Sequence, residues 1–312
     1  MTKPGTLTLG PLLFNWPADR WSDFYARIAD EAPVDRVCLG EVICAKRLPF
    51  YAERIPPVVE RLRRAGKTVV LSSLGLITLA RERRASTELI LDGAAEVEVN
   101  DLTLLAYLVP DRRFAVGPLV NVYNEGTLRF LAARGARHVC LPPELPLDSV
   151  APISALAVEL GVTVEAWAFG RIPLALSGRC YHARVHGLSK DSCQFVCGED
   201  VDGLAVETVD GDRFLAVNGV QTLSHSYACG LDDLEVLLRA GVTSFRLSPH
   251  SCDMVAVARL FRDALDDAQD SSLDADAAGR ALAHLLPGAD FSNGFLAGRP
   301  GADFVPRDRP GR

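Results

Sequence analysis

Short runs of β-branched and other apolar residues alternate with longer amphipathic stretches along most of the chain. Eight runs predict strands, at residues 6–10, 35–39, 68–73, 96–99, 113–117, 137–141, 162–168 and 243–247. The stretches with helical spacing lie at 19–31, 49–65, 79–92, 101–108, 124–134, 147–160, 232–240 and 253–267. Strands separated by helices form a parallel sheet that is covered on its faces, and eight such units close a barrel. We therefore predict an α/β fold, a (β/α)8 barrel of the TIM-barrel type.

One long interval interrupts this alternation after the seventh predicted strand. The insertion covers about residues 171–230 and contains Cys180, Cys193 and Cys197. It then holds a predicted β-hairpin, since residues 203–209 and 212–218 flank an Asp-Gly turn. We predict one domain over residues 1–290, with this insertion. Residues 291–312 are rich in Gly, Pro, Arg and Asp, and we predict a disordered tail there.

Charge and hydropathy indicate which partners the chain can bind and in which compartment it is located. The net charge is −7 at pH 7, whereas a nucleic-acid site needs clustered Lys and Arg, so we predict no nucleic-acid partner. No apolar run approaches the ~20 residues of a membrane span, and no apolar segment of a signal peptide follows Met1. A cytoplasmic location is therefore predicted. There, eight cysteines favour metal binding or redox chemistry over disulfide bonds.

Four cysteines form a candidate metal site. Cys180, Cys193 and Cys197 have the spacing C-x12-C-x3-C, and Cys38 ends the second predicted strand. Helical residues 191–197 would place Cys193 and Cys197 on one face. The barrel would bring all four thiols to its carboxyl-terminal rim. Four thiolates suit a [4Fe–4S] cluster or a structural zinc ion, although the C-x2-C pairs typical of zinc are absent. Buried structural thiols are the alternative.

Several other side chains allow two readings. Cys44 is either a ligand or a nearby spare thiol, and Cys252 is a weak alternative ligand. His182 and His186 form His-x3-His, but Ala183 stands where a zinc protease has its catalytic Glu, so zinc ligation is the less favoured reading. Glu165 is either a buried, hydrogen-bonded carboxylate or an acid at the rim.

The segment 165–180 resembles the signature of the collagenase-like peptidase family. That signature has a Glu, an aromatic residue two positions later, a Gly, and then Ala-x-Ser-Gly-x-Cys. The matching residues are Glu165, Trp167, Gly170, Ala175, Ser177, Gly178 and Cys180. Many relatives have His where this chain has Phe169, and an additional Cys where it has Pro173. In these two departures the chain resembles the branch of the family that serves ubiquinone biosynthesis.

This resemblance implies a cofactor, partners and a process. The ligands of that branch look like one early Cys and a C-x12-C-x3-C group, which Cys38, Cys180, Cys193 and Cys197 match. They imply a [4Fe–4S] cluster. The resemblance also implies a heterodimer with a UbiU-like homologous protein, and a lipid-carrier accessory protein of the same pathway. Together they would serve O2-independent hydroxylation of the ubiquinone ring, with prephenate as oxygen donor.

Two alternative functions stay open. The family name suggests a collagenase-like peptidase, although no metalloprotease helix and no Gly-x-Ser-x-Gly elbow is present in the sequence. The other alternative is a non-catalytic structural partner that stabilises its homologue. Removal of Cys180 should abolish iron and function together only if the protein acts through a cluster.

Overall fold

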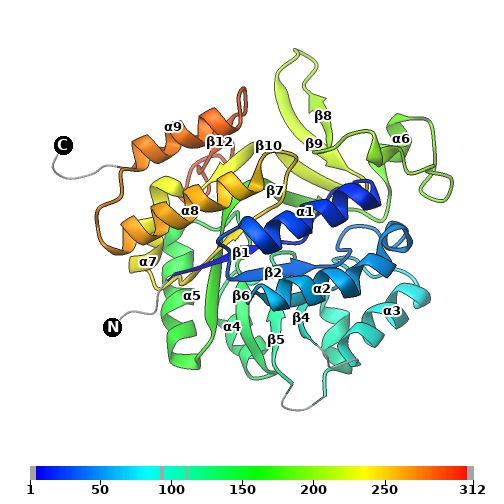
Figure 1. Cartoon of the computed structure of the whole chain (residues 1–312), viewed down its shortest axis with the longest axis horizontal. Coiled ribbons are helices and arrows are strands. Elements are labelled where there is room, and N and C mark those ends of the chain that lie inside the picture. The colour runs from blue at the N-terminus through cyan, green and yellow to red at the C-terminus, as the bar shows by residue number, and fades with distance from the viewer. Residues whose placement is uncertain (1–4, 92–94, 110–111, 308–312) are drawn as a thin grey trace.

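Eight parallel strands close into a barrel in the computed structural model, which describes residues 5–91, 95–109 and 112–307. Each strand pairs with its neighbour in the chain, and the eighth pairs with both the first and the seventh. The predicted fold class is confirmed (Figure 1). The barrel strands are β1 (Thr6–Leu9), β2 (Arg36–Leu39), β3 (Thr68–Ser72), β4 (Glu96–Val99), β5 (Phe114–Val116), β6 (Ala136–Cys140), β7 (Thr163–Leu176) and β11 (Ser244–Leu247).

Helices follow the strands and cover the outside of the barrel (Figure 1). They are α1 (Ala18–Glu31), α2 (Ile55–Arg64), α3 (Ala80–Leu91), α4 (Glu125–Ala132), α5 (Leu147–Leu160), α7 (Leu234–Arg239) and α8 (Met254–Gln269). Residues 101–108 were predicted as a helix and instead contain the 3-10 helix η3 (Leu102–Tyr107). Short 3-10 helices also precede α2 and α7: η1 (Leu48–Phe50), η2 (Ala52–Arg54) and η5 (Leu231–Asp233).

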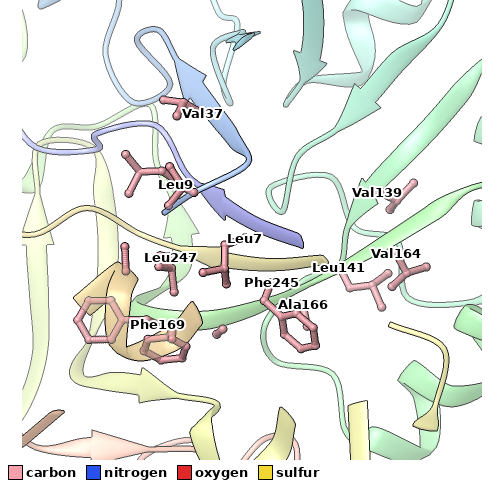
Figure 2. Close-up of a cluster of buried hydrophobic side chains, with 14 of the residues drawn as sticks. Leu7, Leu9, Val37, Val139, Leu141, Val164, Ala166, Phe169, Phe245 and Leu247 are labelled. Carbon is pink, nitrogen blue, oxygen red and sulfur yellow. The ribbon is translucent and has the colours of Figure 1, made fainter. Parts of the chain in front are cut away.

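Side chains alternate between the two faces of the barrel strands, as the period of a β-strand requires. The apolar ones contact the surrounding helices and form the main core. Figure 2 shows part of it, including Leu7 and Leu9 of β1 and Phe245 and Leu247 of β11. Each of these four side chains is fully buried, which stabilises the fold by about 1.5–3 kcal/mol apiece. The intervening positions belong to the barrel interior, which is unusually polar.

The insertion begins where β7 leaves the barrel. Gly170 has φ +112°, and a Cβ there would lie 2.7 Å from Cβ of Ser248, so only glycine fits this bend. Beyond it, β7 pairs antiparallel with β10 (Gln221–Cys229). The predicted hairpin is confirmed as β8 (Leu204–Glu207) and β9 (Arg213–Asn218). The helix α6 (Tyr181–Val185) and the 3-10 helix η4 (Val196–Gly198) lie between β7 and this hairpin in the chain.

The chain after α8 packs onto the insertion side of the barrel. It forms α9 (Ala275–Leu285), which the sequence analysis does not predict, and β12 (Phe291–Ser292), which pairs in parallel with β10. Asn293 donates to Asp233 and exchanges hydrogen bonds with Val305. Residues 291–307 therefore differ from the predicted disordered tail, because polar side chains and a strand pairing hold a segment of low hydrophobicity in place. Residues 308–312 of that tail lie outside the described residues.

Candidate metal centre

Four cysteines line one cavity between the β2–α2 loop and the insertion. They are Cys44, Cys180, Cys193 and Cys197, and all are free thiols. Cys193 and Cys197 are buried, and the other two are half-buried. Three segments that are distant in sequence thus present sulfur atoms to the same space. Three of these four residues belong to the predicted ligand set, and the fourth, Cys44, is the thiol that the sequence left as either a ligand or a spare.

Cys44 reaches the cavity through a loop that is built around a buried carboxylate. Glu41 accepts hydrogen bonds from the backbone N–H groups of Ile43 (2.8 Å) and Cys44 (2.9 Å), and from the Tyr51 hydroxyl (2.9 Å). Gly40, at the start of the loop, has φ +133°, and a Cβ there would lie 2.4 Å from the Ser72 carbonyl oxygen. The sequence Gly-Glu therefore fixes the path of the loop, and with it the position of Cys44.

Cys180 lies at the amino terminus of α6. Its sulfur accepts a hydrogen bond from the backbone N–H of Ala183 at 3.5 Å, so the thiol caps the helix. Just before it, the Ser177 hydroxyl accepts from the backbone N–H of Arg179, and the Ser177 backbone binds Val220 of the neighbouring turn. Burial raises the pKa of the Cys180 thiol, although the Ala183 N–H opposes this.

Cys193 and Cys197 are joined by a strained turn rather than by the predicted helix. Gln194 and Phe195 both have positive φ, 48° and 57°, a region that non-glycine residues rarely occupy. Each such residue costs of the order of 1–3 kcal/mol, and strain of this kind concentrates at functional sites. The turn is followed by η4, in which Cys197 is buried. The backbone conformation of this turn is strained, and it places both thiols at the same cavity.

Two cations from the same loop as Cys44 border the thiols. The Lys46 ammonium is 3.6 Å from the Cys193 sulfur and donates to the backbone carbonyls of Lys190 (2.7 Å) and Asp191 (3.2 Å). Arg47 is fully buried, and its guanidinium donates to the Leu13 carbonyl and to Asn218, both at 2.9 Å. These positive charges are suited to offset the negative charge of thiolates gathered at this site.

Cys38 lies elsewhere, so the structure brings together only three of the four predicted ligands. It is fully buried on β2, and its sulfur is 3.8 Å from both Glu98 and Arg246 inside the barrel. It does not line the cavity of the other three cysteines. The reason is strand periodicity: Val37 and Leu39 face the outer core, so Cys38 faces inward. Burial raises the pKa of this thiol, and the Glu98 carboxylate adds to the increase.

The barrel interior holds a second polar cluster, around the Arg246 guanidinium. Arg246 makes ion pairs with both Glu98 and Glu165, and all three side chains are at most 1% exposed. His138 is 2.9 Å from Glu165, and Ser244 donates to it at 3.0 Å. Burial alone would raise the pKa of each carboxyl, but Arg246 holds both pKa values below the ordinary range. Glu165 is therefore the buried, hydrogen-bonded carboxylate of the two predicted readings.

A further cavity occupies the mouth of the barrel. Glu98, Asn100, Gln221, Arg246 and Ser248 line it, together with apolar residues that include Trp167 and Pro173. Three of these carry a buried polar atom without a hydrogen-bond partner: Oδ1 of Asn100, Nε2 of Gln221 and Oγ of Ser248. Gln221 follows Gly219 and Val220, which line the cysteine cavity, so one turn borders both spaces.

Of the remaining candidate residues, Cys252 is separate from the four thiols, whereas His182 is not. Cys252 lies beside Met254 in a groove that Trp16 also lines, and Cys229 is buried in the main core. His182 lines the cysteine cavity and is 2.9 Å from Asp200, and the exposed His186 stacks against it.

The donor set fits a metal centre larger than one ion. Zinc–sulfur bonds of about 2.3 Å in a tetrahedron bring sulfurs to within about 3.8 Å of one another. Among the described residues, the group whose candidate ligand atoms all lie within 4.8 Å is His182, His186 and Asp200, so no three of these sulfurs are that close. Four soft thiol ligands around a wider space are the donors that iron–sulfur clusters use.

Fold and site together define a (β/α)8-barrel protein with a cysteine-lined cavity between a barrel loop and an insertion after β7. The profile of Peptidase family U32 matches residues 20–305, and the chain belongs to that family. A collagenase of Porphyromonas gingivalis (strain ATCC BAA-308 / W83) is 24% identical over 237 residues, which is 72% of this chain and 54% of the collagenase. The chain thus spans about half the length of that curated relative.

Solved structures share the general architecture at low similarity. An uncharacterized B. cereus protein is 10% identical with a TM-score of 0.42, over 85% of this chain and 65% of that one. A tryptophan synthase complex from Pyrococcus furiosus is 13% identical with a TM-score of 0.41, over 87% of this chain and 98% of that one. Similarities at this level carry no argument about function. Among the described residues, no helix has the length and apolar character needed to cross a membrane.

Proposed function

We propose that this chain binds a [4Fe–4S] cluster through Cys44, Cys180, Cys193 and Cys197. The observation that carries the proposal is the meeting of these thiols, from three distant segments, in one cavity. The strained turn at Gln194 and Phe195 supports it, because backbone strain of this kind concentrates at functional sites. When bound, the cluster would supply one-electron transfer.

The surrounding residues would set the charge and solvent access of this site. Lys46 lies against the Cys193 sulfur, and the buried Arg47 lines the same cavity, so both offset the negative charge of the thiolates. The Phe195 ring packs edge-on against Phe50, with 4.7 Å between ring centroids, and covers one side. Positive charge and limited water are the features by which proteins tune cluster reduction potentials.

We further propose that the chain is a UbiV-like protein that acts in O2-independent ubiquinone biosynthesis. In this role it pairs with a UbiU-like homologue and a lipid-carrier accessory protein, in ring hydroxylation with prephenate as oxygen donor. The support is membership of the U32 family together with the residues Phe169 and Pro173 within the signature 165–180. Pro173 lines the barrel-mouth cavity, which shares a turn with the cysteine site.

The decisive experiment compares two cysteines six positions apart. The protein is co-purified anaerobically with its candidate homologue, and iron, sulfide and visible absorption are measured for wild type and single Cys→Ala variants. Loss of iron and sulfide is expected for the variants of Cys44, Cys180, Cys193 and Cys197. Cys38→Ala is the matched control and should retain both. Zinc in place of iron, or unchanged iron in Cys44→Ala, would refute the proposed ligand set.

A peptidase is the second candidate, favoured by the name of the family and of the collagenase relative. The same variants separate the two: hydrolysis of collagen peptides that survives Cys44→Ala and Cys180→Ala would support a peptidase without a cluster. Anaerobic ubiquinone synthesis in a host that carries these variants tests the third candidate function, a non-catalytic structural partner. If synthesis continues without iron in the protein, the chain is a structural partner of its homologue.

A further inference from the structure

A second group of metal-binding side chains lies on the insertion beside the cysteines. The candidate ligand atoms of His182, His186 and Asp200 all lie within 4.8 Å of one another. His182 lies in α6 and His186 directly follows its last residue, one turn further on, and the two rings are nearly parallel with centroids 5.7 Å apart. His182 is fully buried, whereas His186 is exposed and Asp200 is partly so. The group therefore has a fixed inner ligand and an open outer side.

The hydrogen bonds of His182 leave a negative group facing a lone pair. Its Nδ1 is 3.2 Å from the Val217 carbonyl oxygen, which can only accept, so one tautomer of the ring carries its proton on Nδ1. The Gly219 N–H also approaches Nδ1, but at the longer distance of 3.5 Å. In the neutral ring Nε2 is then an acceptor, and it lies 2.9 Å from a carboxylate oxygen of Asp200. In that tautomer a cation bridges the two acceptors: either a proton, which makes His182 and Asp200 an ion pair, or a metal ion that the three clustered ligand atoms would hold.

A metal ion fits this gap in distance and in surroundings. Two ligand atoms about 2.1 Å from one ion, at a right angle, are about 3.0 Å apart, close to the separation of Nε2 and the Asp200 oxygen. Metal-bound histidines commonly donate their other N–H to a backbone carbonyl, and the Val217 carbonyl is placed to accept such a bond from His182. Two imidazoles and one carboxylate are a donor set for divalent first-row transition metals.

We propose that His182, His186 and Asp200 bind one divalent transition-metal ion, with open positions toward solvent. The site is separate from the four thiols, although Cys180 begins the same helix and His182 lines the same cavity. A redox-active or Lewis-acidic ion here would lie beside the cysteine site. The proposal does not depend on the cluster, since none of the three ligands is a cysteine.

Anaerobic titration with Co2+ tests the site, because the absorption of cobalt reports its ligands. The full chain, as purified with its cluster, should bind one equivalent with weak ligand-field bands and no thiolate-to-cobalt charge-transfer band. His186→Ala, an exposed change that leaves the buried His182 in place, should weaken binding about tenfold or more. Asp200→Asn should do the same. His284→Ala, an exposed histidine on α9, is the matched control and should bind like wild type.

Three results would overturn the proposal. Cobalt could fail to bind, or bind equally well to His186→Ala, and His182 and Asp200 would then form only an ion pair. Cobalt could also bind solely with a charge-transfer band that disappears in Cys44→Ala, which would place it on the thiols. Conversely, retention of the ligand-field bands in a Cys44→Ala protein that has lost its iron would show that the two sites fail or succeed independently.

Discussion

Replacing Arg246 by methionine should destabilise the protein strongly, because one guanidinium neutralises two buried carboxylates. Methionine preserves much of the volume but leaves Glu98 and Glu165 without a cation, and both are at most 1% exposed. Breaking a buried ion pair by removal of one partner costs about 3–5 kcal/mol. For a chain of this size each kcal/mol lowers Tm by about 2 °C, so a decrease of about 6–10 °C is expected.

The loss should depend on pH in a defined direction. In wild type Arg246 holds the pKa values of both glutamates below the ordinary range, so their stabilising contribution is present above about pH 4.3 and is lost as the pH falls. Without Arg246, burial outweighs the remaining opposing contacts from Asn100 and His138, and we expect the folded pKa values to rise above the unfolded ones. Protonation of Glu98 and Glu165 then removes the two uncompensated charges of the variant at low pH. The difference in unfolding free energy between wild type and variant should therefore shrink between pH 7 and pH 4.

Urea unfolding of wild type and Arg246→Met across this pH range measures the effect. Arg27→Met is a suitable control, since its ion pairs with Glu31 and Asp253 are about half exposed and contribute at most about 1 kcal/mol. A deficit of less than about 1 kcal/mol at pH 7, or one that does not change with pH, would refute the reasoning that this guanidinium compensates two buried charges.

Two further predictions concern the loop that carries Cys44. Gly40→Ala should destabilise the fold by about 1–3 kcal/mol, because its φ of +133° and its 2.4 Å approach to the Ser72 carbonyl exclude a Cβ; urea midpoints should show a smaller loss for Gly66→Ala, where a Cβ would meet nothing within 4 Å. Lys46→Met should retain iron but lower the reduction potential of a cluster at this site, since a positive charge beside Cys193 favours the reduced state. An unchanged potential in an anaerobic redox titration would contradict this.

The barrel could be predicted from the sequence because its strands and helices have different periods. Each predicted barrel strand overlaps an observed one, and the Asp-Gly turn locates the hairpin. β10 and α9 were not predicted. β10 contains the polar run 224–226, which its pairings with β7 and β9 accommodate. α9 is rich in alanine, so its apolar face gives a weak signal, and it becomes evident only when Leu282 is buried in the core.

The alternation of side chains along the second strand distinguishes Cys38 from Cys44. Cys38 lies within the second strand, one residue before its end, and Cys44 lies five residues beyond that end, so both are near the rim of the barrel. With Val37 and Leu39 in the outer core, Cys38 must face the interior. Cys44, beyond the strand, is free of that constraint. The convergence with Cys180 depends on the Glu41 hydrogen bonds and on the path of the insertion, which no periodicity reveals.

The molecule has two polar centres, one around Arg246 inside the barrel and one at the four thiols outside it. In the barrel, Glu98 and Glu165 are both committed to Arg246, so neither carboxylate is free to act as a base without the loss of an ion pair. Outside the barrel, the thiols border two cations, Lys46 and Arg47, and the strained turn at Gln194 and Phe195. Between them lies the turn 219–221, which borders the cysteine cavity on one side and places Gln221 in the barrel mouth on the other. A molecule held by the unpartnered groups of that mouth would be a short distance from the proposed cluster, an arrangement that favours electron transfer over hydrolysis.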